Sequence, residues 1–258
     1  MQLQVRPLGE QIKQWRHLRR LSQMELALEA EISTRHLSFI ETGRSRPSRE
    51  MVLLLADRLS LPLRERNAML LGAGFAPLYS ERRLDAPELG AARRAVDLVL
   101  KGHEPYPALA VDRHWNMVAA NAAVAPLLVG VAAGLLEPPV NVLRLSLHPE
   151  GLARRILNLG EWRAHLLDRL RRQAWMTSDP ALEALLAELW AYPSAEGAGA
   201  AEDFADVIVP LRLASPLGEL RFLSTTTVFG TPLDVTLDEL AIEAFFPADA
   251  ETAERLRV

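Results

Sequence analysis

Residues 22–48, SQMELALEAEISTRHLSFIETGRSRPS, constrain the fold of this chain more than any other stretch. Ser22 stands three positions before Glu25, the spacing at which each side chain satisfies a free amide at the start of a helix. A helix is therefore predicted from Gln23. Its buried side is expected to carry three apolar residues at spacings of three and four: Leu26, Ala27 and Ala30. The small alanines allow a second helix to cross closely.

That second helix is predicted directly after a tight turn. Ser33 caps it, Leu37 and Ile40 form its inward face, and Ile32 packs beneath the turn. Gly43 is expected to end it in a left-handed conformation. Five residues near its N-terminal end are predicted to face outward and to read base edges in the DNA major groove: Ser33, Thr34, Arg35, Ser38 and Phe39. The pattern predicts a gene regulator.

The residues after this helix suit phosphate contacts, which position a protein on DNA without reading sequence. They are Arg44, Arg46 and Ser48. An arginine-rich loop is more often a solvated surface, so no single arginine carries the prediction. The combination with the two caps and the helix spacing carries it.

The stretch resembles the helix-turn-helix of phage-repressor-like regulators, the XRE or Cro/C1 type, over residues 8–74 and five helices. The resemblance is carried by Gln23, Leu26, Ala27, Ser33, Ile40, Glu41, Gly43 and the Arg-Pro-Ser at 46–48. It implies that Gln23 touches the phosphate backbone and that Glu41 pairs with Arg16, which we also place among the phosphate candidates. Glu31 stands where the family commonly has glycine. A glutamate at positive φ costs roughly 1 kcal/mol, so we expect a slightly rebuilt turn.

Charge is divided unevenly along the chain. Residues 1–75 hold 12 Lys and Arg against 8 Asp and Glu, and the remainder holds 17 against 25, so the two parts carry +4 and −8. Only the first part suits double-stranded DNA. A net charge of −4 argues against a general nucleic-acid coating protein, whose affinity comes from counterion release over many basic groups. Sequence-specific binding is therefore favoured.

Length and composition predict two domains in a cytoplasmic protein. A chain of 258 residues exceeds the usual size of one domain, and 49% hydrophobic residues supply a second core. Cysteine is absent, which excludes disulfides and thiolate metal sites. No apolar run has the length of a bilayer span, and the polar N-terminus is not that of a secretory signal.

Caps and prolines divide the chain further. Ser48 caps a fourth helix, and Pro62 opens a fifth that closes at Gly72 and Gly74. A proline-punctuated stretch without periodicity follows and is interpreted as a connector. The predicted parts are a helix-turn-helix domain at 1–75, a linker at 76–87 and a second domain at 88–258, which opens with a helix ending near Gly102.

The second domain mixes strands and helices. A hairpin is predicted at 107–121, with a small helix after Asn121. Two helices are predicted next, at about 150–176 and from Asp179 onward, and 194–203 is predicted to be a loop. Three strands close the domain: 206–213, 219–230 and 239–246. This order predicts an α+β domain with a mostly antiparallel sheet.

Two resemblances cover this domain and the whole chain. Residues 111–121 and 206–246 resemble the opening and closing strands of a PAS domain, in which a five-stranded antiparallel sheet cups a small-molecule cavity. The entire chain resembles the MmyB-like regulators, through residues 66–77, 112–121, 141–162 and 229–252. This implies an all-α five-helix repressor-like DNA-binding domain followed by an α+β PAS-like domain that holds an apolar ligand such as a fatty acid.

Candidates for contact with such a ligand are Trp115, Asn121, His148, Phe222 and Phe229, with Phe245 and Phe246 as further aromatic residues on the strands. Aromatic residues on strands are more often plain core, and a histidine before a proline is more often a loop residue. An alternative therefore stays open. In it, the second domain has a filled core and serves only for dimerisation or protein interaction.

The sequence contains no catalytic or metal-binding pattern. Its histidines, at 17, 36, 103, 114, 148 and 165, do not form HExxH, and no nucleophile elbow or phosphate-cradling glycine loop is present. Asp234, Asp238 and Glu239 fall in a predicted turn, where solvation explains them. We expect a regulator and not an enzyme. We also expect a homodimer, because heads of this kind usually meet pseudo-palindromic sites about one helical turn apart.

Overall fold

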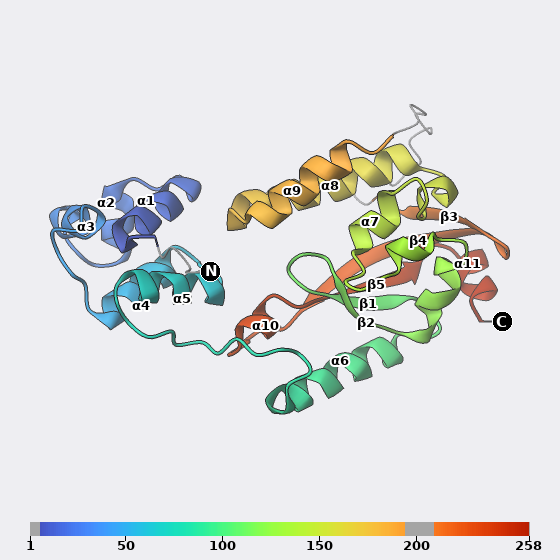
Figure 1. Cartoon of the computed structure of the whole chain (residues 1–258), viewed down its shortest axis with the longest axis horizontal. Helices are drawn as coiled ribbons and strands as arrows, with labels where there is room; N and C mark the ends of the chain where they lie inside the picture. Colours follow the sequence, from blue (N-terminus) through green and yellow to red (C-terminus); the bar gives the residue numbers. More distant parts are fainter. Residues whose placement is uncertain (1–5, 194–208, 258) are drawn as a thin grey trace. The chain divides into compact units, whose positions relative to one another are not determined.

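The computed structural model describes residues 6–193 and 209–257, which form two compact units (Figure 1). The first unit combines Met1–Arg83 with Thr231–Asp238, and the second combines Leu84–Gly230 with Glu239–Val258. The predicted loop at 194–203 and the start of the predicted strand at 206–213 lie outside the described residues. Each unit has its own hydrophobic core.

The first unit, called the head below, contains the five predicted helices. They are α1 (Leu8–Leu18), α2 (Gln23–Glu29), α3 (Thr34–Glu41), α4 (Arg49–Arg58) and α5 (Leu63–Gly72). Its core consists of side chains that the helical spacing places inward, among them Ile12, Leu26, Leu37, Ile40 and Leu55. The prediction of an all-helical head is confirmed.

The predicted helix starts of the head are also confirmed. The Ser22 hydroxyl accepts the Glu25 N–H at 3.1 Å, and the Glu25 carboxylate accepts the Ser22 N–H at 2.6 Å. The hydroxyls of Ser33 and Ser48 each accept the backbone N–H three residues on. Gly43 has φ of 72° and ends α3 as expected. These caps depend on neighbours within four residues, which is why the sequence reveals them.

The turn between α2 and α3 is regular, so the expectation of a rebuilt turn was wrong. Glu31 has φ of 54°, its N–H bonds to the Leu28 carbonyl, and the Ile32 N–H bonds to the Ala27 carbonyl. This is the Schellman pattern, in which a left-handed residue lets two late amides satisfy helix carbonyls. Arg20 and Ser60 end α1 and α4 in the same way. The head therefore tolerates non-glycine residues at three such positions.

The second unit is built on a five-stranded antiparallel sheet in the order β2-β1-β5-β4-β3. Its strands are β1 (Ala108–Val111), β2 (Met117–Ala120), β3 (Leu211–Ser215), β4 (Gly218–Val228) and β5 (Ala241–Pro247). Its α-helices are α6 (Gly90–Gly102), α7 (Val142–Leu147), α8 (Leu159–Thr177), α9 (Pro180–Trp190) and α11 (Ala250–Arg255). Short 3-10 turns are η1 (Pro87–Leu89), η2 (Ala122–Leu128), η3 (Ala133–Leu135) and η4 (Ala153–Arg155). The predicted α+β layout is confirmed.

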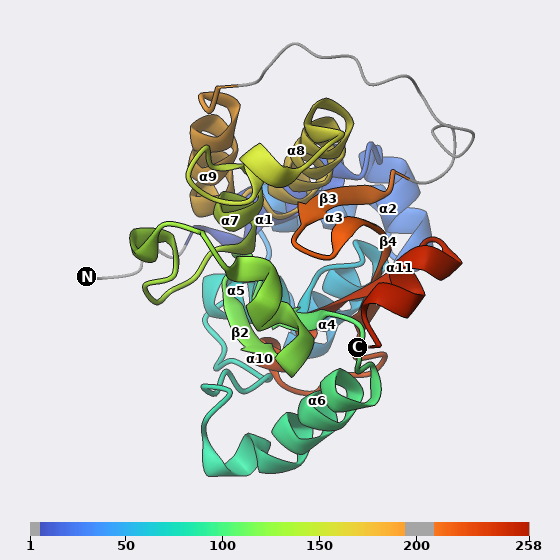
Figure 2. The ribbon, with the colours of Figure 1, turned by 90° about the vertical axis from the view of Figure 1, so that its right-hand side faces the viewer.

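Helices cover the sheet on both sides. Figures 1 and 2 show α8 and α9 on one side and α6 on the other. The core between α8 and the sheet joins Leu166 and Leu170 of the helix to Leu213, Leu220 and Phe222 of the strands. These three helices precede β3 in sequence, and α11, which follows β5, bonds to β4 through the Arg221 N–H and the Thr252 hydroxyl.

One predicted helix is interrupted. The predicted helix at 150–176 is instead a turn, then η4, and only then α8. Gly151 lies so close to the Leu145 carbonyl that an added Cβ would come within 2.3 Å of its oxygen. Ile156 then forms an isolated bridge with Leu213 of β3. Apolar spacing does not reveal this break, because these tertiary contacts compete with helix formation.

The acidic residues of the β4–β5 turn are not explained by solvation, so that interpretation was wrong. Asp234 is buried and pairs with Arg82, and Asp238 accepts the N–H of Leu63 at the start of α5. A short helix, α10 (Val235–Asp238), lies between the two strands and belongs to the compact unit of the head. A buried carboxylate needs a partner from another segment, and the sequence does not show that partner.

Candidate nucleic-acid interface and internal cavity

Helix α3 presents a polar outer side and a buried inner side. Leu37 and Ile40 are fully buried in the head, whereas Ser33, Thr34 and Arg35 are exposed. Ser38 and Phe39 are half-buried. The Arg35 guanidinium lies 5.3 Å from the centre of the Phe39 ring. All five predicted base-reading residues therefore lie at or next to the accessible surface of one helix.

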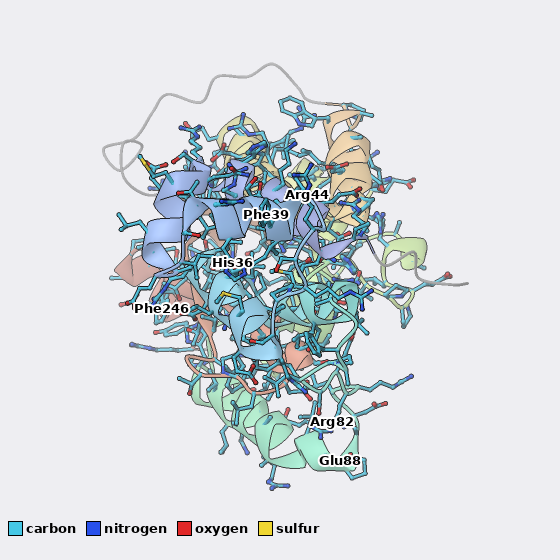
Figure 3. The ribbon with its side chains drawn as sticks, turned by 90° about the vertical axis from the view of Figure 1, so that its left-hand side faces the viewer. His36, Phe39, Arg44, Arg82, Glu88 and Phe246 are labelled. Atoms are coloured by element: carbon cyan, nitrogen blue, oxygen red, sulfur yellow. The ribbon has the colours of Figure 1, made fainter. Side chains whose placement is uncertain are left out.

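His36 is a further exposed residue of this turn, and the sequence analysis did not select it. Figure 3 labels it on the head together with Phe39 and Arg44. Its backbone N–H donates to the Ser33 hydroxyl at 3.1 Å, and the residue is exposed in the first turn of α3. Its position directly after Arg35 in an N-terminal helical turn was a signal that could have identified it.

A hydrogen-bond network holds the start of α2 against the end of α3. The Arg16 guanidinium donates to both carboxylate oxygens of Glu41, at 2.8 and 3.1 Å, as the family resemblance implied. The Gln23 amide donates to the same carboxylate at 2.6 Å. Arg16 and Glu41 side chains are only 8% and 4% exposed. This pair therefore belongs to the packed interior of the head.

The environment of Glu41 favours its charged form. Burial alone raises the pKa of a carboxyl group, but hydrogen bonds from Arg16 and Gln23 and the positive charge of Arg16 oppose it. The net effect lowers the pKa of Glu41 below its ordinary value of 4.5. The Gln23 amide keeps a second N–H, because only one of its two donors is used by Glu41.

The predicted phosphate residues have different surroundings. Arg44 and Arg46 are exposed in the loop after α3. Ser48 is exposed as well, but its hydroxyl accepts the Met51 N–H as the cap of α4 at 3.2 Å. Arg16 is buried and donates to Glu41 and to the Leu21 carbonyl. The loop arginines are therefore accessible to a polyanion, whereas Arg16 is not.

The second unit contains a partly open cavity of about 100 Å³ between the sheet and the helices. Among its lining residues are the apolar side chains Leu109, Trp115, Val124, Leu127, Leu143, Trp162, Leu166, Leu213, Phe222 and Phe245. The polar lining side chains are Ser146, Arg169, Ser224 and Glu243. An apolar lining with a few polar groups is typical of a small-molecule site.

The polar part of the cavity is organised around Arg169 of α8. Its guanidinium donates to both oxygens of the Glu243 carboxylate, at 2.6 and 3.0 Å, and to the Thr226 hydroxyl at 2.7 Å. It also stacks on Trp115, 4.5 Å from the ring centre. Trp115 has φ of 66°, unusual for an aromatic residue. Arg169 thus joins the helix, the sheet and the β1–β2 turn at one point.

The predicted ligand residues do not all reach this cavity. Trp115 and Phe222 line it, whereas Asn121, His148 and Phe229 are not among its lining residues. The Asn121 amide is buried and donates to the Leu100 and Tyr106 carbonyls. His148 ends α7, where its Nδ1 accepts the Glu150 N–H. Asn121 and His148 are therefore used in local structure.

Two further aromatic residues differ in the same way. Phe245 lines the cavity, but its neighbour Phe246 is 43% exposed and packs edge-on against His103. Strand alternation places them on opposite faces of the sheet. Arg169 was missed by the sequence analysis. An arginine at helical spacing from Trp162 and Leu166 in an apolar stripe was the available signal.

Among residues 6–193 and 209–257, no helix has the length and hydropathy of a membrane span. Within the same residues, no group of three or more histidine and acidic side chains is arranged to hold a metal ion.

The head has five helices and leaves α3, the second helix of its helix-turn-helix, accessible. An α+β domain around an apolar cavity follows it. This combination defines a class of DNA-binding transcription regulators with a ligand-binding domain. A family described as MmyB-like transcription regulator ligand binding domain matches residues 92–258, and a helix-turn-helix domain family matches residues 7–69. The chain belongs to the MmyB-like transcription regulators. No curated protein matches the sequence.

Proposed function

We propose that α3 reads a specific DNA sequence and that an apolar ligand in the cavity controls this binding. The single observation that supports the first part is the two-sided character of α3. Leu37 and Ile40 fix the helix to the core, and Ser33, Thr34 and Arg35 are left accessible. Such a helix meets base edges with its N-terminal residues.

Phosphate contacts are assigned to the groups that remain accessible. Arg44 and Arg46 supply positive charge from the loop, the second N–H of Gln23 supplies a neutral donor, and Ser48 lies beside them in sequence. Arg16 is given a supporting role, because its pairing with Glu41 orients Gln23. The chain is expected to act as a cytoplasmic homodimer on a pseudo-palindromic site.

Base reading and phosphate binding are separated by a pair of matched variants. Arg35→Ala is expected to lose about 1 to 3 kcal/mol on duplexes selected from a random library and to relax preference at one position. Arg46→Ala is expected to weaken all duplexes alike and to reduce the salt dependence by about one counterion. Gel shifts and repeated selection measure both effects. Equal, sequence-blind losses would contradict the assignment of Arg35.

For the second domain we propose a small apolar ligand, with a fatty acyl compound as the leading class. The apolar lining supports an alkyl chain, and Arg169 with Ser224 offers hydrogen bonds to a polar end. The presence of the cavity favours this function over a filled interaction module.

Trp115 and Trp162 line the cavity and report on its occupancy. Titration with dodecanoate is expected to change their fluorescence in a saturable way, because the bound ligand would change the surroundings of both indoles. Ser224→Trp places a large side chain in the same space and should abolish the response, while Phe246→Ala, outside the cavity, should preserve it. Absence of a saturable response, with no lipid in extracts of the purified protein, would favour the dimerisation or protein-interaction alternative.

A further inference from the structure

The connection between β4 and β5 is shared by the two parts of the protein. Thr231–Asp238 clusters with the head, although the two strands that it joins belong to the second unit. Both strands line the cavity, β4 with Phe222 and Ser224 and β5 with Glu243 and Phe245. The same stretch of chain therefore begins at the cavity, enters the head and returns to the cavity.

The first attachment of this connection is a helix cap. The Asp238 carboxylate accepts the Leu63 N–H at 2.9 Å at the start of α5. The residue at the N-cap of α5 is Pro62, whose side chain has no acceptor. A helix start leaves four amides without helical partners, and an acceptor there stabilises it. The start of α5 thus depends on a residue 175 positions later in the chain.

The second attachment is centred on Asp234. Its side chain is 5% exposed and lies 3.2 Å from the Arg82 guanidinium. Val235 is fully buried and donates its N–H to the Ser80 carbonyl at 2.8 Å, and the Thr236 hydroxyl donates to the Arg82 carbonyl at 2.5 Å. These bonds involve backbone as well as side chains, so they fix the segment in register.

The residues that receive this attachment are themselves fixed to α5. The Asn67 amide donates to the Tyr79 carbonyl at 2.7 Å, and its oxygen accepts the N–H groups of Leu78 and Tyr79. Arg64 donates to both oxygens of the Glu81 carboxylate. The connection therefore reaches α5 at its start through Asp238 and along its length through residues 78–82.

We propose that the β4–β5 connection transmits the state of the cavity to the head, with Asp234 and Asp238 as its attachment points. This inference rests on the proposed ligand-controlled DNA binding. The two strands pair continuously from Phe222 and Pro247 to Val228 and Ala241, so a shift of their cavity side chains is carried to the connection by the ladder. A ligand can change the DNA affinity of the protein only if it binds more tightly to one of two states of the β4–β5 connection than to the other.

The first test measures coupling in the full chain. DNA affinity for a selected duplex is determined with and without dodecanoate for wild type, Asp234→Ala, Asp238→Ala and Leu233→Ala. In wild type the two affinities are expected to differ about fivefold or more. In both aspartate variants the ratio should approach one while dodecanoate still binds. Leu233 is the matched control, because it lies in the same segment but is 82% exposed, and its variant should keep the wild-type ratio.

A second test needs no ligand. Ser224→Leu fills part of the cavity, and Phe222→Ala enlarges it. In both variants, hydrogen exchange is followed at the Leu63 amide, whose N–H donates to the Asp238 carboxylate. Exchange at Leu63 is expected to change about fivefold in at least one folded variant. The Leu26 amide, which bonds within α2 to the Ser22 carbonyl, should stay unchanged.

The two proposals fail differently. A wild-type protein that binds no dodecanoate contradicts the proposed ligand, and the exchange test still decides the inference. Aspartate variants that keep the wild-type affinity ratio overturn the inference, as does unchanged exchange at Leu63 in both folded cavity variants. Coupling lost together with dodecanoate binding would also overturn it, because the aspartates would then act on the cavity itself.

Discussion

Glu41 is the residue that joins three helices of the head, because its carboxylate accepts from Arg16 of α1 and Gln23 of α2. The charge of the pair is buried, so removing either partner leaves the other without compensation. The loss of one partner of a buried pair costs about 3 to 5 kcal/mol. This makes Glu41 a support of the proposed interface and not a contact with DNA.

Replacement of Glu41 should change how the stability of the head depends on pH. The folded pKa of Glu41 is lowered from 4.5, so its contribution is present above that value and lost as the pH falls below it. Glu41→Gln is expected to cost about 3 kcal/mol at pH 7. The gap between the variant and wild type should narrow at acid pH.

Urea unfolding at neutral and acid pH measures this gap. Glu29→Gln, exposed on α2, removes the same charge without a buried partner and serves as the control. A constant difference between Glu41→Gln and wild type across the pH range would contradict the role given to Glu41.

At the scale of elements, the turn that joins α2 and α3 has a fixed geometry, and it places Glu31 in a backbone conformation that is unfavourable for a non-glycine residue. Glu31 occupies a left-handed conformation that costs an L-residue roughly 1 to 2 kcal/mol. The turn keeps this geometry because the Ile32 and Glu31 amides both bond to helix carbonyls. The hydrogen bonds of the turn therefore outweigh the backbone strain at Glu31.

Glu31→Gly is therefore expected to stabilise the head by about 0.5 to 1 kcal/mol, because glycine adopts this conformation without strain and loses part of the gain to chain entropy. Thermal unfolding measures the change. Glu29→Gly, in the last turn of α2, is the matched control and should destabilise the head by about as much. A lower melting temperature for Glu31→Gly would show that the glutamate side chain stabilises the turn.

Elements were predictable where their signals are local. The caps at Ser22, Ser33 and Ser48 and the strand hairpin at 107–121 follow from spacing within a few residues. The break before α8 and the helix α10 were not predicted. Ile156 bridges to Leu213 and Asp238 accepts the Leu63 N–H, so both act through partners distant in sequence, and apolar periodicity carries no signal for such contacts.

At the scale of the whole molecule, the head is not complete within its own stretch of sequence. Its compact unit includes Thr231–Asp238, with fully buried Val235 and the cap of α5 by Asp238. Burial of a valine and one helix cap each contribute on the order of 1 to 2 kcal/mol. A head defined only by its helix-turn-helix sequence therefore lacks the segment Thr231–Asp238, which is part of its compact unit.

A fragment of residues 1–83 is expected to fold with a stability lower by about 2 kcal/mol or more than the head of the full chain. Hydrogen exchange of core amides in α4 and α5 measures the stability of the head in both forms. Asp238→Ala in the full chain should account for about 1 kcal/mol of the difference. Equal protection in fragment and full chain would show that Thr231–Asp238 contributes nothing to the head.

The sequence by itself determined the five-helix head, the caps, the outward side of α3 and the α+β order of the second domain, because these depend on residue spacing and on neighbours a few positions apart. Tertiary structure decided which aromatic residues face the cavity, that Arg169 organises its polar part, and that Asp234 and Asp238 belong to the head. These features depend on contacts between distant segments. Asp234 and Asp238 bond to Arg82 and Leu63, more than a hundred residues earlier in the chain, and such buried groups gain their partners only once the chain has folded.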